Sequence, residues 1–291
     1  MNEIPALEEP AIIFAEKCDR GILRQENNDS VLHLRIPLGD LMVVADGVGG
    51  YIGRSTASQM VVESFREHLA ALPSDYPADK ALQEAAKFTN AKLLMTPREP
   101  GMPNVRIGST VVVALLQESA EGPHAWVGHI GDSRAYLVRV GRLHRLTTDH
   151  SAVQSLLSRN LISPQEAENH PDISMLTRSL GRLPEVEIDI EKHPLAIGDT
   201  LLLCSDGLWG FVPEHEIEKA TAGPTLDAAA QNLIDLALAA GGHDNISIEI
   251  ARLIPPPAPP RRAGLPPWFK WIVTLFLLAI AGLCVLAYYI L

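Results

Sequence analysis

The chain has few cysteines, and their spacing suits neither a metal site nor a disulfide framework. Among its 291 residues are 3 cysteines, Cys18, Cys204 and Cys284, and no two of them form a CxxC pair. This pattern argues against a zinc site and against a disulfide scaffold. We therefore expect a protein of a reducing compartment whose cysteines take no part in its chemistry.

Basic charge is also scarce, and the formal net charge is -11. No basic stripe offsets this acidity, so we expect no nucleic-acid partner. The N-terminus, MNEIPALEEP, lacks the basic and apolar regions of a signal peptide. Neither GxxxxGK nor HExxH occurs, which disfavours P-loop and zincin chemistry.

What the chain does have is a series of acidic residues in short apolar or glycine-bearing strings. They are Asp29 in RQENNDS, Asp46 in LMVVADGVGG, Asp132 in HIGDSRAYL, Asp206 in LLLCSDGLWG and Asp244 in GGHDNIS. Several follow short apolar runs that are typical of buried strands. A desolvated carboxylate needs a positive partner, yet no Lys or Arg accompanies Asp46, Asp206 or Asp244 in its string. The strings therefore predict a shared site for hard divalent cations, which prefer oxygen ligands.

Hydrophobic patterning predicts clustered strands with separate helices. The expected strands are residues 31–36, 41–45, 110–116, 125–130, 135–140, 143–146 and 201–204. The expected helices are residues 55–72, 78–94, 151–159, 164–169, 213–221 and 225–240. Residues 139–142 are typical of a tight hairpin, with Gly141 at its turn. This grouping favours an α+β fold over an alternating doubly wound sheet.

The C-terminal segment differs from the rest of the chain. Residues 254–267, IPPPAPPRRAGLPP, cannot form a regular helix or a central strand and predict a semi-rigid spacer. Residues 271–291 carry no charged side chain and are about long enough to cross a bilayer. Trp271 and Tyr289 stand where interfacial anchors would, and basic residues only precede the segment, so we expect the body of the protein on the cytoplasmic face of the cytoplasmic membrane. The expected organisation is a soluble domain at 1–253, a linker at 254–267 and a single-pass transmembrane tail anchor at 268–291.

Taken together, the strings resemble the bacterial branch of the metal-dependent protein phosphatases of the PPM type (type 2C). The strings that carry the resemblance are RGILRQENNDS, VVADGVGGYIGRSTAS, GSTVVVALL, VGHIGDSRAYLVRVGRLHRLTTDHS, ISMLTRSLG, LLLCSDGLWGFV and GGHDNISI, in the family's order. The similarity extends from about Cys18 to Ile250. The resemblance implies a four-layer α-β-β-α sandwich of two antiparallel sheets flanked by helices. It also implies hydrolysis of phosphoserine and phosphothreonine on proteins with two or three Mn²⁺ or Mg²⁺ ions.

The same resemblance implies a set of metal ligands. Asp46 is expected to bridge two ions, with the carbonyl of Gly47 on one of them. Asp206 and Asp244 are expected to complete the protein ligands of the other ion. Asp132 matches the residue that serves a third, weaker ion in bacterial members.

Two further positions match residues that act on the substrate or on water. Arg24 corresponds to the arginine that binds the substrate phosphate, where a planar guanidinium suits two oxygens at once. Asp29 corresponds to an acidic residue that orders metal-bound water. A metal-bridged hydroxide would then attack phosphorus without a protein nucleophile. The family often has glutamate where this chain has Asn28, so one metal site is expected to be weaker.

We expect structural roles for the other polar residues near the acidic strings. His129, His150 and His243 lie near the acidic strings, but sites for hard cations seldom use imidazole, so we expect none of them to be a ligand. Asp149 is predicted to be a turn or helix-cap residue. Residues 151–180 resemble the family's flap beside the site, which would tune substrate choice.

The expected partners are phosphorylated proteins, above all a serine/threonine kinase and its substrates, with the membrane reached through the C-terminal helix. Three alternatives stay open: a catalytically weak phosphatase fold that binds and signals, a membrane scaffold whose proline segment recruits partners, and a phosphatase for small phosphomonoesters. Asn28 is the feature that favours the first of these.

Overall fold

The computed structural model describes residues 11–49, 54–96, 107–168 and 170–256, and residues 269, 271, 272, 274, 279 and 280 of the C-terminal segment. The chain separates into two units, Met1–Pro256 and Pro257–Leu291.

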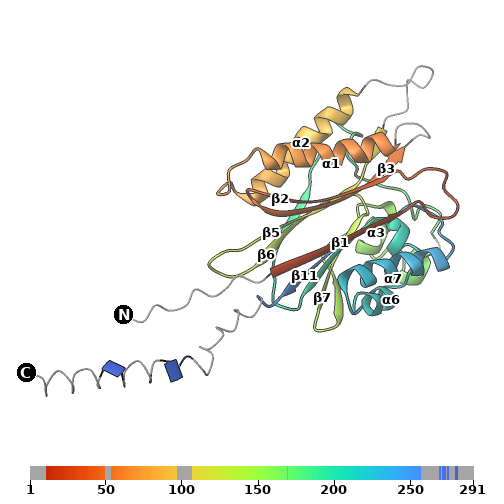
Figure 1. The fold of residues 1–291 in the computed structure, drawn as a ribbon. Helices are drawn as coiled ribbons and strands as arrows, with labels where there is room; N and C mark the ends of the chain where they lie inside the picture. Colours follow the sequence, from red (N-terminus) through yellow and green to blue (C-terminus); the bar gives the residue numbers. More distant parts are fainter. Residues whose placement is uncertain are drawn as a thin grey trace, which may run out of the picture. The chain divides into compact units, whose positions relative to one another are not determined.

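Two antiparallel sheets form the centre of this unit (Figure 1). The first has the order β1 (Ala11–Asp19), β11 (Ile246–Ile254), β10 (Thr200–Cys204), β7 (Arg134–Arg139), β8 (Arg142–Arg145). The second has the order β2 (Asp29–Ile36), β3 (Gly39–Gly49), β5 (Val111–Gln117), β6 (His124–Ile130), β9 (Asp189–Pro194), and β4 (Ile107–Ser109) pairs with β3. Every strand pair is antiparallel.

Helices cover the outer face of each sheet (Figure 1). α1 (Arg54–Ala70) and α2 (Ala78–Met95) pack on the second sheet. α5 (Asp206–Trp209), α6 (Glu214–Ala220) and α7 (Leu226–Ala239) pack on the first. The short helices α3 (Ala152–Ser158) and α4 (Pro164–Glu168) belong to residues 151–180, which we call the flap segment.

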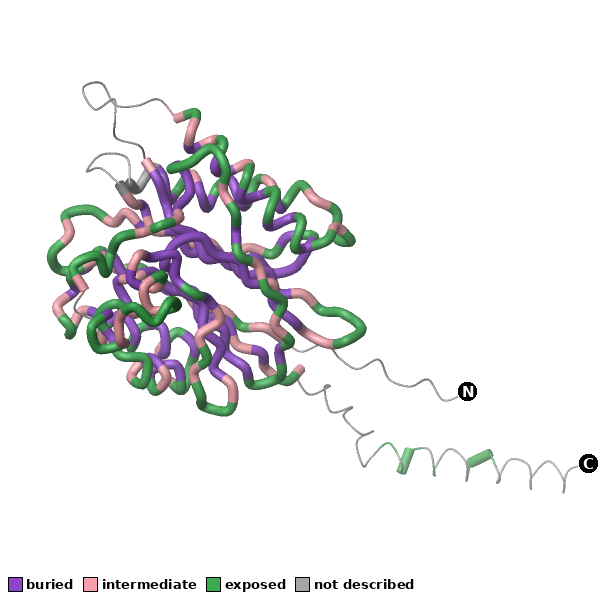
Figure 2. The backbone as a smooth tube through the Cα atoms, turned by 180° about the vertical axis from the view of Figure 1, so that it is seen from behind, coloured by how far each residue is buried: buried purple, intermediate pink, exposed green. Residues whose placement is uncertain are grey.

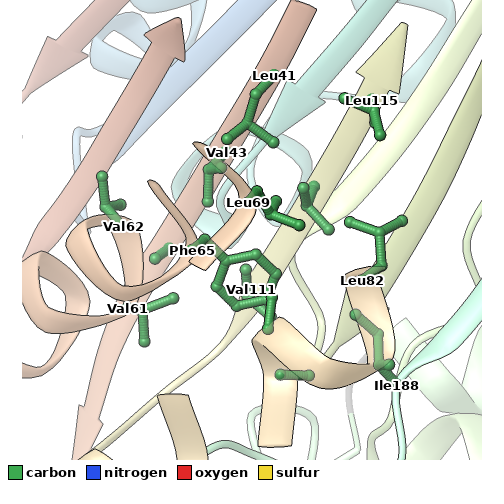
Figure 3. Close-up of a cluster of buried hydrophobic side chains, with 14 of the residues drawn as sticks. Leu41, Val43, Val61, Val62, Phe65, Leu69, Leu82, Val111, Leu115 and Ile188 are labelled. Atoms are coloured by element: carbon green, nitrogen blue, oxygen red, sulfur yellow. The ribbon is translucent and has the colours of Figure 1, made fainter. Parts of the chain in front are cut away.

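Three apolar layers hold these parts together, and Figure 2 shows the buried backbone concentrated in the sheets. On α1, Ala57, Val61, Phe65 and Leu69 recur every fourth residue and are fully buried, so one face of the helix meets the sheet. Figure 3 shows Phe65 of this layer among side chains from the sheet and α2. A second layer lies beneath α5–α7 and a third between the sheets, which confirms the predicted four-layer sandwich.

Most predicted elements are found within one or two residues at their ends, whereas β3 extends further at both ends than the strand expected at 41–45. The hairpin at 139–142 is also confirmed, with Val140 and Gly141 both at positive φ (51° and 71°), as a tight two-residue turn requires. The sequence reasoning missed β1, β4, β9, β11 and α5. β11 had a signal, because Ile246, Ile248 and Ile250 alternate with other residues and face α7. β9 had none, since its mostly polar residues form an edge strand that is fixed by pairing with β6.

The predicted transmembrane span lies almost entirely outside the described residues. Of residues 271–291, only 271, 272, 274, 279 and 280 are described, and they are helical. Within the described part of the chain, no helix combines the length and the apolar character that crossing a bilayer requires. The anchor at 268–291 therefore stays a prediction.

The strand directions bring the acidic strings to one end of the sandwich. Asp29 begins β2, and its cross-strand partner on β3 is Asp46. Asp206 follows the end of β10, and Asp244 precedes the start of the neighbouring β11. Asp132 lies in the turn that carries the chain from β6 in one sheet to β7 in the other. Antiparallel pairing makes these ends neighbours, so residues far apart in the sequence share one region.

Away from that end, β11 carries a buried carboxyl that the sandwich does not neutralise. Glu249 is fully buried, and both of its carboxyl oxygens have no hydrogen-bond partner among the described residues. It lies on the same face of β11 as the inward-facing Ala251 and Leu253, so it points between the two sheets. Burial raises its pKa to about 9, and the neighbouring Glu16 on β1 adds to the shift.

We expect Glu249→Gln to stabilise the protein at alkaline pH. The folded-state pKa of about 9 lies above the ordinary value of 4.5, so the stability due to this group is complete below about pH 4.5 and is lost as the pH rises toward 9. The gain in the melting temperature of the variant should therefore be largest near pH 8–9 and small near pH 5. Thermal unfolding across this range, with the exposed Glu185→Gln as a matched control, measures it. A gain that does not grow with pH would contradict this account.

Candidate active site

A cleft of about 200 Å³ opens at the end of the sandwich where the acidic strings meet. Its lining residues are Arg24, Asn28, Asp46, Gly47, Val48, Asp132, Ser174, Leu176, Asp206, Asp244 and Asn245. All the metal ligands expected from the resemblance, and Arg24, are therefore brought together. Asp29 lies directly beside them, paired with Asp46 across β2 and β3.

The backbone of Asp46 is held by Ser109, the last residue of β4, and by Thr110, which precedes β5. Its amide donates to the hydroxyl of Thr110 over 3.1 Å, and its carbonyl accepts from the Thr110 amide and the Ser109 hydroxyl at 2.9 and 2.8 Å. The Thr110 hydroxyl also lies 2.7 Å from that of Ser133, next to Asp132. These contacts fix the Asp46 carboxylate relative to the turn that carries Asp132. The sequence reasoning missed Ser109 and Thr110, although both stand in the quoted string GSTVVVALL.

Ser205 joins Asp29 to the strand that delivers Asp206. Its hydroxyl donates to Asp29 Oδ2 over 2.7 Å and accepts from the Ser247 amide over 3.0 Å. Gly207 lies so close to the next loop that a Cβ there would be 2.0 Å from the carbonyl oxygen of Asn245. The glycine after Asp206 therefore serves close packing of α5 against β11.

Asn245 lines the cleft next to Asp244 and was not singled out from the sequence. It is buried, and its Oδ1 accepts from the Asn28 amide at 2.8 Å. Its Nδ2 donates to the carbonyls of Arg20 and Glu26 at 2.8 and 2.9 Å. One side chain thus fixes the loop that carries Arg24. The neighbouring Asp244 in the same string was the only available sequence signal.

Crowded carboxylates dominate the electrostatics of the cleft. Burial, followed by repulsion from Asp29, Asp206 and other aspartates, raises the pKa of Asp46 well above its ordinary value. The pKa of Asp206 is raised by burial and by Asp132 and Asp244 in the same way. Burial raises the pKa of Asp132 to about 7 and that of Asp29 to about 6. The site is therefore arranged to favour added positive charge.

The available donors fit hard divalent cations. Asp206 Oδ1 and Asp29 Oδ1 are buried, and within the described chain neither has a hydrogen-bond partner. Carboxylate and carbonyl oxygens line the cleft without a histidine or cysteine. Oxygen-only donors of this kind suit Mg²⁺ and Mn²⁺.

Arg24 contributes the cationic side chain to the cleft lining. Its Nη2 lies 2.5 Å from Asp244 Oδ2, and both side chains are partly exposed. The resemblance predicted that Arg24 binds phosphate and Asp244 binds an ion. For both roles to hold, this ion pair has to open, and the partial exposure of the two groups permits that.

The prediction for Asp149 is wrong. The cap of α3 is Ser151, whose side chain accepts from the Gln154 amide. Asp149 is buried and accepts from two guanidinium groups, those of Arg134 and Arg145. A buried carboxylate with two cationic partners is a structural ion pair that sequence spacing alone did not indicate.

We expect Mn²⁺ binding to weaken as the pH falls from 8 to 6. Ions bind the deprotonated carboxylates, and the raised pKa values of Asp132 (about 7) and Asp29 (about 6) mean that protons compete in this range. The dissociation constant should rise at least ~10-fold over this interval. Calorimetric titration in buffers of different ionisation enthalpy should also detect proton release. A pH-independent affinity without proton release would contradict the assignment.

Comparisons with known proteins agree with this geometry. The sequence model of the protein phosphatase 2C family matches residues 21–235. The serine/threonine protein phosphatase PstP of Mycobacterium tuberculosis is 35% identical over 248 residues, which are 83% of this chain and 45% of PstP. The chain thus spans about half the length of that relative. The serine/threonine phosphatase Stp of Listeria monocytogenes is 35% identical over 238 residues, 80% of this chain and 92% of Stp.

A solved structure shows the same arrangement of elements. The catalytic domain of PstP in complex with two manganese ions superposes with a TM-score of 0.70 at 33% identity, covering 84% of this chain and 98% of that domain. These relatives agree with the predicted enzyme class, protein serine/threonine phosphatase. The chain belongs to the protein phosphatase 2C family.

Proposed function

We propose that this cleft hydrolyses phosphoserine and phosphothreonine on proteins with two or three Mn²⁺ or Mg²⁺ ions. Asp46 would bridge two ions, the carbonyl of Gly47 would join one, and Asp206 and Asp244 would complete the other. Asp132 would serve a third, weaker ion. The observation that supports this most is the convergence of four buried or partly buried aspartates on one cleft beside Arg24, with the buried Oδ1 of Asp206 left without a hydrogen-bond partner among the described residues. The manganese ions of the PstP domain support the choice of metal.

When bound, such ions supply an activated water and offset charge on the phosphate. The residues of the chain then have separate tasks. Arg24 would leave Asp244 and bind two phosphate oxygens through its planar guanidinium, orienting the group for in-line attack. Asp29, fixed by the Ser205 hydroxyl, would accept a hydrogen bond from a water in the cleft through its other oxygen. Cys204 takes no part, because it is fully buried in β10 and burial raises the pKa of its thiol to about 12.

The surroundings of the cleft support a protein substrate over a small phosphomonoester. Leu23, next to Arg24, is 63% exposed. On the flap segment, Ile173 and Met175 flank the cleft residue Ser174 and are 46% and 52% exposed. Apolar side chains near the mouth of a polar cleft are suited to contact the residues on either side of a phosphorylated side chain. A free metabolite would leave them in water.

Removal of Asp206 tests the function directly. We expect the full-length chain with Mn²⁺ or Mg²⁺ to release phosphate from a phosphothreonine peptide, with kcat/KM higher than for a small phosphomonoester. Asp206→Asn should lower kcat at least ~100-fold, or about 2.7 kcal/mol, because a charged ligand is lost. EDTA should have a similar effect, whereas the exposed Asp75→Asn should leave turnover unchanged. A folded chain that shows no turnover with either metal would instead favour the catalytically weak binding protein that Asn28 suggests.

We further propose that residues 268–291 anchor the enzyme to the cytoplasmic membrane, with the phosphatase domain in the cytoplasm. The apolar, uncharged composition of residues 271–291 supports this. A serine/threonine kinase and its substrates at that membrane would then be the partners. Membrane fractionation should place the full-length chain in the pellet, resistant to high salt, and a chain ending at residue 256 in the supernatant. Equal distribution of the two would overturn the anchor, and retained turnover by the shorter chain would argue against a pure scaffold.

A further inference from the structure

His150 joins the turn before Asp132 to the flap segment. The residue is 8% exposed, and its backbone amide donates to the Gly131 carbonyl over 2.9 Å. In return, the Gly131 amide donates to His150 Nδ1 over 3.1 Å. Two hydrogen bonds thus hold the residue that immediately precedes Asp132.

The other side of the same residue holds the flap segment. The His150 carbonyl accepts from the Thr177 amide over 2.8 Å. Because Nδ1 accepts a hydrogen bond, the ring proton lies on Nε2, which donates to Asp189 Oδ2 over 3.1 Å. The second oxygen of Asp189 accepts from Arg178, near the end of the flap segment. His150 therefore contacts the turn after β6, β9 and the flap segment.

The Gly131–Asp132 turn has little freedom apart from these contacts. Gly131 has a φ of +106°, which side chains other than glycine rarely adopt. A Cβ at this position would lie 2.6 Å from Cγ2 of Thr110, the residue that holds Asp46. Asp132 follows a tightly packed peptide, and the amide of that peptide donates a hydrogen bond to His150. The direction of the Asp132 carboxylate thus depends on this contact.

His129, His150 and Asp189 also place three potential ligand atoms within 4.8 Å of one another. The hydrogen bonds do not suit a cation there. His129 Nε2 lies 2.8 Å from the Thr148 carbonyl and donates to it. A cation on His150 Nε2 would displace its proton while Nδ1 accepts from Gly131, which would require a doubly deprotonated ring. The stacked rings, with centroids 4.5 Å apart, are packing partners.

We propose that His150 is a positioning residue for Asp132: its Nδ1 fixes the Gly131–Asp132 turn, and its Nε2–H ties that turn to Asp189 and the flap segment. The proposal rests on the proposed role of Asp132 as ligand of the third, weaker ion. Burial and the neighbouring His129 lower the pKa of His150 to about 4, so the ring is neutral and Nδ1 stays an acceptor near neutral pH.

Two substitutions separate the two ring nitrogens. In His150→Asn, the side-chain oxygen can take the place of Nδ1 and still accept from the Gly131 amide, but the side chain is too short to reach Asp189. In His150→Gln, the terminal amide can reach Asp189, but no acceptor remains near Gly131. Asp132→Asn serves as the reference for loss of the ligand, and the exposed His144→Gln serves as the control.

The measurement is Mn²⁺ binding to the full-length chain by calorimetry and by electron paramagnetic resonance of free Mn²⁺. We expect His150→Gln to weaken the weakest site ~10-fold, as loss of a residue that orients a ligand typically does, and His150→Asn to stay within ~3-fold of the unmodified chain. The tighter sites should be unchanged in both. Equal weakening by the two variants would point to a cation held by the ring and overturn the proposal, as would an unchanged weakest site in His150→Gln.

A third variant guards against misfolding of the first two. Asp189 is 48% exposed on an edge strand, so Asp189→Ala is expected to fold. It should raise the dissociation constant of the weakest site no more than ~3-fold, as His150→Asn does, because both variants lose the contact to Asp189 and keep an acceptor for the Gly131 amide. A ~10-fold rise in Asp189→Ala would overturn the proposal. If the unmodified chain and Asp132→Asn bind Mn²⁺ identically, the ligand role of Asp132 itself fails. Turnover that is still abolished by Asp206→Asn would then leave the proposed enzyme function intact.

Discussion

Carboxylates buried side by side repel one another and resist losing water, and four aspartates share one cleft in this protein. Asp46, Asp132, Asp206 and Asp244 come from four separate parts of the chain, and Arg24 accompanies them. The raised pKa values of Asp46 and Asp206 express this conflict. The proposed divalent ions would resolve it, because they add positive charge to that of Arg24. The repulsion between these carboxylates thus lowers the stability of the fold at the place where the proposed chemistry needs charged groups.

The frame around the cleft keeps these groups from moving apart. Thr110 holds the backbone of Asp46, Ser205 links Asp29 to β10, and Asn245 fixes the loop of Arg24. Each of these side chains is small, polar and fully or almost fully buried. Such residues satisfy backbone groups that would otherwise be orphaned, and they do so in one geometry only. The proposed metal ligands are therefore placed before any ion or substrate arrives.

The flap segment is joined to this frame through His150. Its contacts to Gly131, Thr177 and Asp189 connect the turn of Asp132 with the segment that supplies Ser174 and Leu176 to the cleft. Asp149, the preceding residue, is buried between two arginines and anchors the same stretch to β7 and β8. Two adjacent residues thus anchor one loop: Asp149 binds β7 and β8, and His150 binds the turn of Asp132 and the flap segment. These contacts link the flap segment to Asp132, the proposed ligand of the third, weaker ion.

Much of this protein is determined by local patterns in its sequence. Some features depend only on neighbours in the chain, so they could be predicted: the apolar strands before Asp46 and Asp206, the Gly141 turn, and the helical spacing of α1 and α7. The order of the acidic strings also indicated the family, and it predicted a ligand set whose residues line one cleft. Tertiary structure alone decided the partners that come from distant strands. Asn245 acts on Asn28, Arg134 stacks on Trp209 and binds Asp149, and edge strand β9 exists through β6. No local preference encodes these contacts, because each depends on which strand ends the folded sheets bring together.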